Sequence, residues 1–339
     1  MGVDISVLVK GAPLRLSDLA GKAVAIDAFN TLYQFLTTIR QPDGTPLKDR
    51  EGRVTSHLSG LLSRNAALLE IGLKPVYVFD GKPPKLKERT IAARREARNA
   101  AEREWKEAVA VGDMKRAKTK ASQSTRLDDD MIAEALALLN ALGIPSVNAP
   151  AEGEAQMAFM ASRRDVWAGA SQDFDALLFG TPMLVRNLTL SKKRRMASGE
   201  RVDVVPELVE LDKVLSSLDL SRKQLVDLSI LVGTDFNEGV PGIGPKRALK
   251  LLREFGSLER VSAERRAAVP QGFEEVRSVF LEPEVTEDYS LFWSLPDEEA
   301  VRRQLCDDRG FSVDRVNSVL SRLRAIPQSC EQSSLDRWG

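Results

Sequence analysis

The segment Pro75-Val-Tyr-Val-Phe-Asp80 decides the reading of the fold, because a short apolar run that ends at an acid is typical of a buried strand. Four similar runs occur along the chain, and helical patterns lie between them. The five runs are Ala23–Ile26, Pro75–Phe79, Pro145–Val147, Val166–Ala170 and Met183–Val185. This alternation predicts an α/β domain with a mainly parallel, twisted sheet flanked by helices.

The composition limits the chemistry that the chain can perform. A single histidine, His57, excludes a multi-histidine metal site, and the two cysteines, Cys306 and Cys330, do not make a disulfide framework. Any metal would therefore be held by oxygen ligands, which favours Mg²⁺ or Mn²⁺. No apolar run approaches the roughly 18 residues that span a bilayer, and the chain does not open on a secretion signal, so we expect a soluble, intracellular protein.

Charge is balanced overall but distributed unevenly. Lysine plus arginine and aspartate plus glutamate number 49 each. Segment 82–126 alone holds fourteen basic and six acidic residues, a surplus of eight positive charges, and it is strongly helical with a break at Gly112-Asp113. A helical segment this polar cannot lie deep in a core. It is either a solvated helical hairpin or a basic clamp, and its position directly after Asp80 and Gly81 favours a clamp over a site.

Acidic residues follow several of the predicted strands and helices. Three strands each deliver an acid to one sheet edge, where sites form in open α/β sheets. Asp173 and Asp175 would share a face if the backbone is extended there, and the glutamate pair would lie at a helix entry. The seven candidate metal ligands are Asp27, Asp80, Glu152, Glu154, Asp173, Asp175 and Asp235.

Carboxylates gathered in one place repel each other unless cations neutralise them. Two divalent ions about 4 Å apart would do so, and would also support phosphodiester cleavage. The alternative for each acid taken alone is a helix cap or a turn former, a frequent role of aspartate at the end of a strand.

Five blocks of the sequence resemble the flap endonucleases of the XPG-type 5′ nuclease family, in order and in spacing. They are Ile26-Asp-Ala-Phe-Asn30, Val78-Phe-Asp-Gly-Lys-Pro-Pro84, Ala149-Pro-Ala-Glu-Gly-Glu-Ala-Gln156, Ser171-Gln-Asp-Phe-Asp175 and Gly233-Thr-Asp-Phe-Asn237. The resemblance runs over nearly the whole chain, and the lack of a long basic tail looks like the archaeal branch. It implies a monomeric enzyme of DNA replication and repair that cuts 5′-flap junctions by a two-metal-ion mechanism, with associated 5′-3′ exonuclease activity.

The resemblance also implies an organisation of the chain. A single nuclease domain would cover residues 1–326, with an N-terminal block to about 110, a helical arch over about 82–126, an internal block over about 127–260 and C-terminal helices over about 261–326. Residues 327–339 would form a flexible tail.

Roles for particular side chains follow from the same resemblance. Two Mg²⁺ ions, which Mn²⁺ could replace, would be held by the seven acids. Asp80, Glu152 and Glu154 would serve one ion and Asp173 and Asp175 the other, with Glu154 shared, and Asp27 and Asp235 would act largely through metal-bound waters. Lys87 and Arg94, seven residues apart and so on one helix face, would contact the scissile phosphate. Tyr33 would stack on a displaced base, or else pack in the core.

The glycine-rich segment Gly239–Ala248 predicts a phosphate-binding turn. Gly242 and Gly244 allow close approach of the backbone to a phosphate, the amides of the following helix start face it, and Lys246 and Arg247 add positive charge. In the family this is a helix–two-turn–helix element that grips duplex DNA and binds K⁺ through the loop backbone. Such a grip reads no base sequence.

The tail Gln332-Ser-Ser-Leu-Asp-Arg-Trp338 resembles the motif by which partners dock on the sliding clamp PCNA. Gln332, Leu335 and Trp338 would enter the clamp groove after folding on binding. The family pattern has a second aromatic residue at the position that Gly339 occupies in this chain.

Three other functions stay open. The first is another nuclease of the same superfamily, either a 5′ exonuclease or a junction-cutting enzyme. The second is a catalytically silent scaffold that binds DNA or the clamp. The third is an α/β hydrolase that acts on small phosphorylated molecules. The seven acids disfavour the scaffold, and the basic arch disfavours the small-molecule hydrolase.

Overall fold

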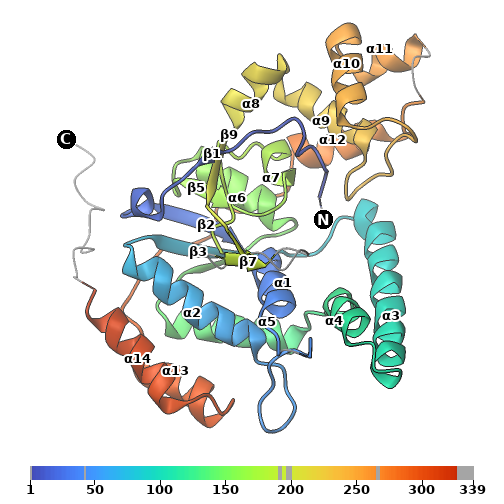
Figure 1. The fold of residues 1–339 in the computed structure, drawn as a ribbon. Coiled ribbons are helices and arrows are strands. Elements are labelled where there is room, and N and C mark those ends of the chain that lie inside the picture. Colours follow the sequence, from blue (N-terminus) through green and yellow to red (C-terminus); the bar gives the residue numbers. More distant parts are fainter. Residues whose placement is uncertain (1, 42, 190–192, 196–200, 265–267, 327–339) are drawn as a thin grey trace, which may run out of the picture.

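The computed structural model describes residues 2–41, 43–189, 193–195, 201–264 and 268–326, and a seven-stranded sheet lies at its centre (Figure 1). The strand order is β1-β9-β6-β5-β2-β3-β4. The strands are β1 Ala12–Pro13, β2 Ala23–Asp27, β3 Lys74–Phe79, β4 Ser146–Asn148, β5 Ala168–Ala170, β6 Met183–Arg186 and β9 Glu207–Glu210. A separate hairpin pairs β7 Lys193–Arg195 with β8 Arg201–Asp203.

The five predicted strands are all present, and they pair in parallel as expected. Strand β2 lies between β3 and β5, and the outer partners β4 and β6 continue the parallel order. The sequence reading missed β1 and β9, which add an antiparallel edge beside β6. The fold is therefore α/β with a mainly parallel sheet.

Helices cover both faces of this sheet. The α-helices are α1 Ala28–Thr38, α2 Ser56–Glu70, α3 Glu88–Ala110, α4 Met114–Gln123, α5 Asp129–Ala141, α6 Gly153–Ser162, α7 Asp175–Leu178, α8 Leu211–Leu218, α9 Arg222–Val232, α10 Pro245–Phe255, α11 Leu258–Ala263, α12 Phe273–Leu281, α13 Glu298–Arg302 and α14 Val313–Arg324. Shorter turns are η1 Leu16–Leu19, η2 Lys85–Lys87 and a π-helical turn η3 over Arg303–Asp307. No helix among the described residues is long and apolar enough to cross a membrane.

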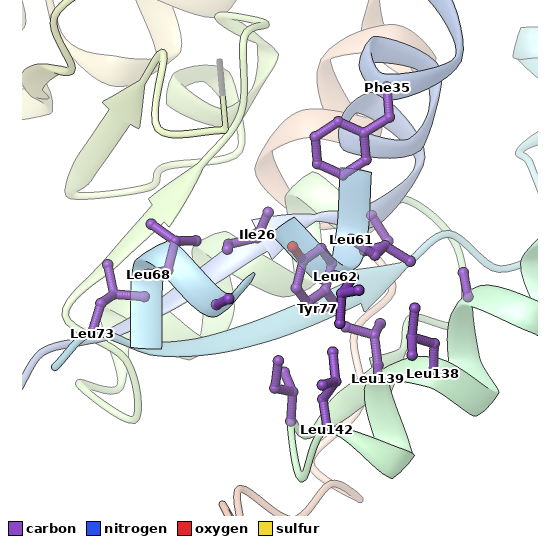
Figure 2. Packing of buried hydrophobic residues seen from close by; sticks show 14 of the residues in the cluster. Ile26, Phe35, Leu61, Leu62, Leu68, Leu73, Tyr77, Leu138, Leu139 and Leu142 are labelled. Carbon is purple, nitrogen blue, oxygen red and sulfur yellow. The ribbon is translucent and has the colours of Figure 1, made fainter. Parts of the chain in front are cut away.

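The side chains of β2 and β3 alternate between two packed layers. Ile26 and Tyr77 face α2 and α5, and Figure 2 shows Tyr77 among Leu61 and Leu62 of α2 and Leu139 of α5. The intervening residues face the opposite layer, where α6 supplies methionine side chains. Burial on both faces explains why these central strands are continuously apolar. Packing on both faces also fixes the positions of the carboxyl ends of these strands, and so of the acids that follow them.

Helices α3 and α4 stand out from one side of the sheet, and α10 and α11 lie at another corner of the molecule (Figure 1). The break predicted at Gly112-Asp113 separates α3 from α4, and Asp113 caps α4 by accepting a hydrogen bond from the Arg116 amide. The buried residues of α3 and α4 are alanines only. The arch of the sequence reading is therefore a thin two-helix hairpin with small residues at its seam.

Candidate active site

Six of the seven predicted acids lie after a strand or at the entry of a helix, and the seventh, Asp235, lies in a loop. Asp27 ends β2 and caps α1, Asp80 follows β3, and Asp173 and Asp175 follow β5. Glu152 and Glu154 stand at the start of α6, and Asp235 lies in the loop between α9 and α10. Because β2, β3 and β5 are parallel neighbours, their acids meet at one sheet edge, as the sequence predicted.

Backbone amides hold three of these carboxylates in place. Asp27 accepts from the Asn30 amide at 2.9 Å, Asp80 from Gly153 at 2.7 Å, and Asp175 from Val3 at 2.7 Å. Asp27 thus does cap a helix, which was the alternative reading of such an acid. Its second oxygen still lies 3.3 Å from the Ser171 hydroxyl inside the cluster, so a cap and a site residue are compatible.

One premise of the sequence reading was wrong. Asp173 and Asp175 do not share the face of an extended segment, because the backbone bends after β5 and α7 begins at Asp175. The Asp175 carboxylate is held by Val3 of the N-terminal segment, and Asp173 accepts from the Asn30 side chain at 3.2 Å.

Burial raises the pKa of five of these carboxyls, and repulsion from neighbouring acids adds to the effect in four of the five. Burial, followed by the charge of Asp80, raises the pKa of Asp27 to about 8. Burial, together with Asp235 and Asp173, raises the pKa of Asp175 to about 7. Burial also raises the pKa values of Asp80, Glu152 and Glu154. Such a cluster of carboxyl groups strongly favours the binding of positively charged groups.

Two cationic side chains from the base of α3 already supply part of that charge. The Lys87 ammonium lies 2.5 Å from Glu152 and 3.8 Å from Asp235. The Arg94 guanidinium lies 2.5 Å from Asp235. Burial disfavours the charged form of Lys87, but its acidic neighbours outweigh that effect and raise its pKa. The structure therefore brings both predicted phosphate contacts to the acids.

Two features of the site were not found from the sequence. Thr90, between Lys87 and Arg94 on α3, donates to the Asp235 carbonyl at 2.7 Å and fixes the arch base to that loop. Gly2 packs so tightly that an added Cβ would lie 2.5 Å from the Asp175 carboxylate. The resemblance began at Met1-Gly2, yet nothing in the residue types signalled that this end of the chain contacts an acid.

The remaining predicted contacts lie outside the acid cluster. Tyr33 is half-buried on α1, and its hydroxyl lies 3.2 Å from Arg98 of α3. Gly242 has a φ of +77°, which favours glycine, and a Cβ added at Gly242 or Gly244 would meet no atom within 4 Å. Gly244 caps α10, and Lys246 and Arg247 are exposed in its first turn. The turn is thus open to an incoming phosphate. The predicted clamp residues Gln332, Leu335 and Trp338 lie outside the described residues.

The donor set suits hard divalent cations. Its ligands are all oxygens, four of the seven acids are buried, and a lysine ammonium sits among them where positive charge is needed. In the described part of the chain, no three His, Cys, Asp or Glu side chains converge as a ready metal-binding group. Glu152 and Asp235 face Lys87 and Arg94, so cation binding requires these side chains to change partners.

Comparisons with known proteins agree with this geometry. The XPG N-terminal domain model matches residues 4–101, and the XPG I-region model matches residues 143–235. The chain is 49% identical to flap endonuclease 1 of Pyrococcus abyssi over 340 residues, covering 100% of this chain and 98% of the relative. It is also 49% identical to flap endonuclease 1 of Methanothermobacter thermautotrophicus over 338 residues, with 100% of each chain covered.

Solved structures of the same family also match this chain over most of its length. Flap endonuclease-1 from Methanococcus jannaschii matches with a TM-score of 0.76 and 43% identity, over 95% of this chain and 98% of that one. The catalytic core of Rad2 in complex with DNA substrate matches with a TM-score of 0.71 and 26% identity, over 92% of this chain and 96% of that one.

Proposed function

Since this chain belongs to the flap endonuclease family of XPG-type nucleases, we propose that it is a metal-dependent, structure-specific nuclease that cuts DNA at 5′-flap junctions. Its products carry a 5′-phosphate and a 3′-hydroxyl, and the same site removes nucleotides from a 5′ end. It acts in DNA replication and repair.

One observation carries the proposal. The acids that follow β2, β3 and β5 lie at one sheet edge, and Lys87 and Arg94 at the base of the helical arch contact two further acids of the predicted set, Glu152 and Asp235. The acids can hold cations, and the basic groups can bind a phosphate between the cations and the arch. A small-molecule hydrolase has no need of a basic hairpin that stands out from the domain, and a scaffold has no need of seven clustered acids.

The acids divide between two Mg²⁺ positions, which Mn²⁺ can also fill. Asp80, Glu152 and Glu154 would hold one ion, and Asp173 and Asp175 would hold the other, with Glu154 able to contribute to both. Asp27 and Asp235 act largely through water. When bound, the two ions activate water and stabilise the leaving oxygen of the phosphodiester. Their binding also favours the ionised state of acids whose pKa values burial has raised.

Lys87 and Arg94 bind the scissile phosphate and stabilise the charge that develops on it. Both already lie at the acids, so a phosphate that enters the site meets them without a movement of α3. Thr90 holds this part of the helix against the Asp235 loop. Tyr33, on the helix that follows β2, stacks on the base displaced next to the cut.

The duplex is held at the start of α10, at the end of the same loop that carries Asp235. The first amides of α10 and the exposed side chains of Lys246 and Arg247 bind the phosphate backbone. The loop backbone would also hold a K⁺ ion, which would add positive charge beside the phosphates. Contacts to the phosphate backbone recognise the shape of the DNA and not its base sequence. The spacing between this duplex-binding turn and the acids would therefore determine which position of a junction reaches the acids.

The tail from residue 327 docks on PCNA through Gln332, Leu335 and Trp338. Deleting residues 327–339 should abolish clamp binding in calorimetry while cleavage of a flap without clamp stays unchanged. Equal clamp affinity of the full chain and the shortened one would refute this assignment.

The substrate class is tested by comparing three DNA structures with Mg²⁺ present. A 5′ flap should be cut faster than a blunt duplex or a four-way junction with the same sequences. A preference for the junction would make the chain a resolving enzyme, and a preference for the blunt duplex would make it an exonuclease.

The metal assignment is tested with Asp173→Asn. The change should abolish cleavage, because it removes one metal ligand. It should leave flap binding largely intact, because asparagine has nearly the same size and shape as aspartate. Asp288→Asn serves as a matched control, since Asp288 is exposed and far along the chain from the seven acids. Retained cleavage in Asp173→Asn would refute the assignment.

A further inference from the structure

Ser171 lies among the acids without being one of them. It directly follows β5, and it is only 5% exposed. Its hydroxyl oxygen lies 2.9 Å from a Glu154 oxygen and 3.3 Å from an Asp27 oxygen, and it accepts from the Asp173 amide at 3.2 Å. A single hydroxyl therefore touches three of the acids, which come from three different elements of the fold.

Those three acids would not keep their places unaided. Asp27 ends β2, Glu154 lies in the first turn of α6, and Asp173 lies in the bend after β5. Like charges at this spacing repel each other in a buried setting. The Ser171 hydroxyl can donate one hydrogen, and the shorter contact assigns it to Glu154. The Ser171 hydroxyl oxygen accepts a hydrogen bond from the Asp173 backbone amide. The Ser171 side chain therefore links the bend after β5 to Glu154 in the first turn of α6.

Asn30 makes the matching link on the other side. Its side-chain amide donates to Asp173 at 3.2 Å, and its backbone amide donates to Asp27 at 2.9 Å. Asn30 lies in the first turn of α1, directly above the end of β2. Two uncharged residues thus connect three carboxylates without adding a negative charge to the cluster.

We propose that Ser171 and Asn30 are positioning residues, which hold Asp27, Glu154 and Asp173 at a spacing fit for divalent cations before any cation binds. The inference rests on the proposed function, because it assigns cations to these acids. Neither residue is a ligand in this account. Residues that hydrogen-bond to ligands in this way typically contribute about 10–100-fold in metal affinity.

The experiment measures Mn²⁺ binding by calorimetry in the absence of DNA. Ser171→Ala should weaken Mn²⁺ binding about 10–100-fold. Asn30→Leu keeps the side-chain volume but removes the side-chain amide that donates to Asp173, so it should also weaken Mn²⁺ binding. Ser171→Thr restores the hydroxyl and should restore the affinity. In cleavage assays Ser171→Ala should raise the Mg²⁺ concentration needed for half-maximal rate, while the rate at saturating Mg²⁺ recovers most of its wild-type value.

Ser229→Ala is the matched control. Ser229 is buried like Ser171, but its hydroxyl donates to the Leu225 carbonyl within α9 and touches none of the seven acids. Its variant should bind Mn²⁺ as the wild type does. Wild-type affinity in Ser171→Ala, or an equal loss in Ser229→Ala, would overturn the inference while the proposed function stands. A wild-type protein that binds no Mn²⁺ would overturn the proposed function as well.

Discussion

Raising the pH without divalent metal should destabilise this protein, and the acid cluster sets the size of the effect. In the folded chain the pKa of Asp27 is about 8 and that of Asp175 about 7. Unfolded aspartate has a pKa near 3.9, so the folded state binds more protons between these values. Stability from these two groups is therefore present in acid and is lost as the pH rises through about 7 to 8.

The magnitude follows from the two values. Between about pH 6 and pH 8 the two carboxyls together should lower the free energy of unfolding by about 3 kcal/mol. For a chain of this size that is about 5 °C in melting temperature. The pKa of His57 is lowered to about 4 by burial, so this side chain stays neutral throughout that window.

Thermal unfolding followed by circular dichroism tests this prediction. In a chelator the melting temperature should fall from about pH 6 to pH 8, and Mg²⁺ should raise it more at the upper pH, because binding to the native state alone stabilises it. Asp27→Asn should remove a large part of the pH dependence. A melting temperature in chelator that is flat or rises over this range would refute the reasoning.

Three further outcomes are expected. Gly2→Ala should lower flap cleavage about 100-fold with an unchanged fold, because the added carbon displaces the acid it faces, and cleavage at the wild-type rate would contradict this. Gly143→Ala should lower the free energy of unfolding by about 3 kcal/mol in chemical denaturation, because the added Cβ would lie 2.1 Å from the Ser294 carbonyl oxygen. Gly21→Ala is the control: Gly21 has a similar φ but open space around it, so its loss should be about 1 kcal/mol. Equal losses in the two variants would contradict the steric argument. Replacing both Lys246 and Arg247 by alanine should reduce the slope of log affinity against log salt for duplex DNA by about 2, and an unchanged slope would remove them from the interface.

The central strands and the order of the acids could be predicted because they follow from local patterns. Apolar runs such as Pro75–Phe79 are buried on both faces, and parallel pairing brings their carboxyl ends to one edge. Strands β1 and β9 could not be predicted, since β1 has only two residues and β9 has only two apolar residues between two glutamates. Their place depends on the free edge of β6, which is a tertiary feature.

The site shows the same division between local and tertiary information. Spacing placed Asp173 and Asp175 on one face if the backbone were extended there, but the chain bends after β5, and Asn30 and Val3 hold the two carboxylates from separate elements. Both partners are distant in sequence. The family resemblance placed Lys87 and Arg94 at the site, and both lie beside the acids, whereas Thr90 carried no signal of its own.

The most direct test of the account is to map the cut on an end-labelled double-flap DNA. With Mg²⁺ the wild-type chain should give one dominant cut at the base of the 5′ flap, and a chelator should abolish it. Cleavage that persists in the chelator, or cuts spread along the duplex without regard to the junction, would contradict a metal-dependent, structure-specific site built on these seven acids.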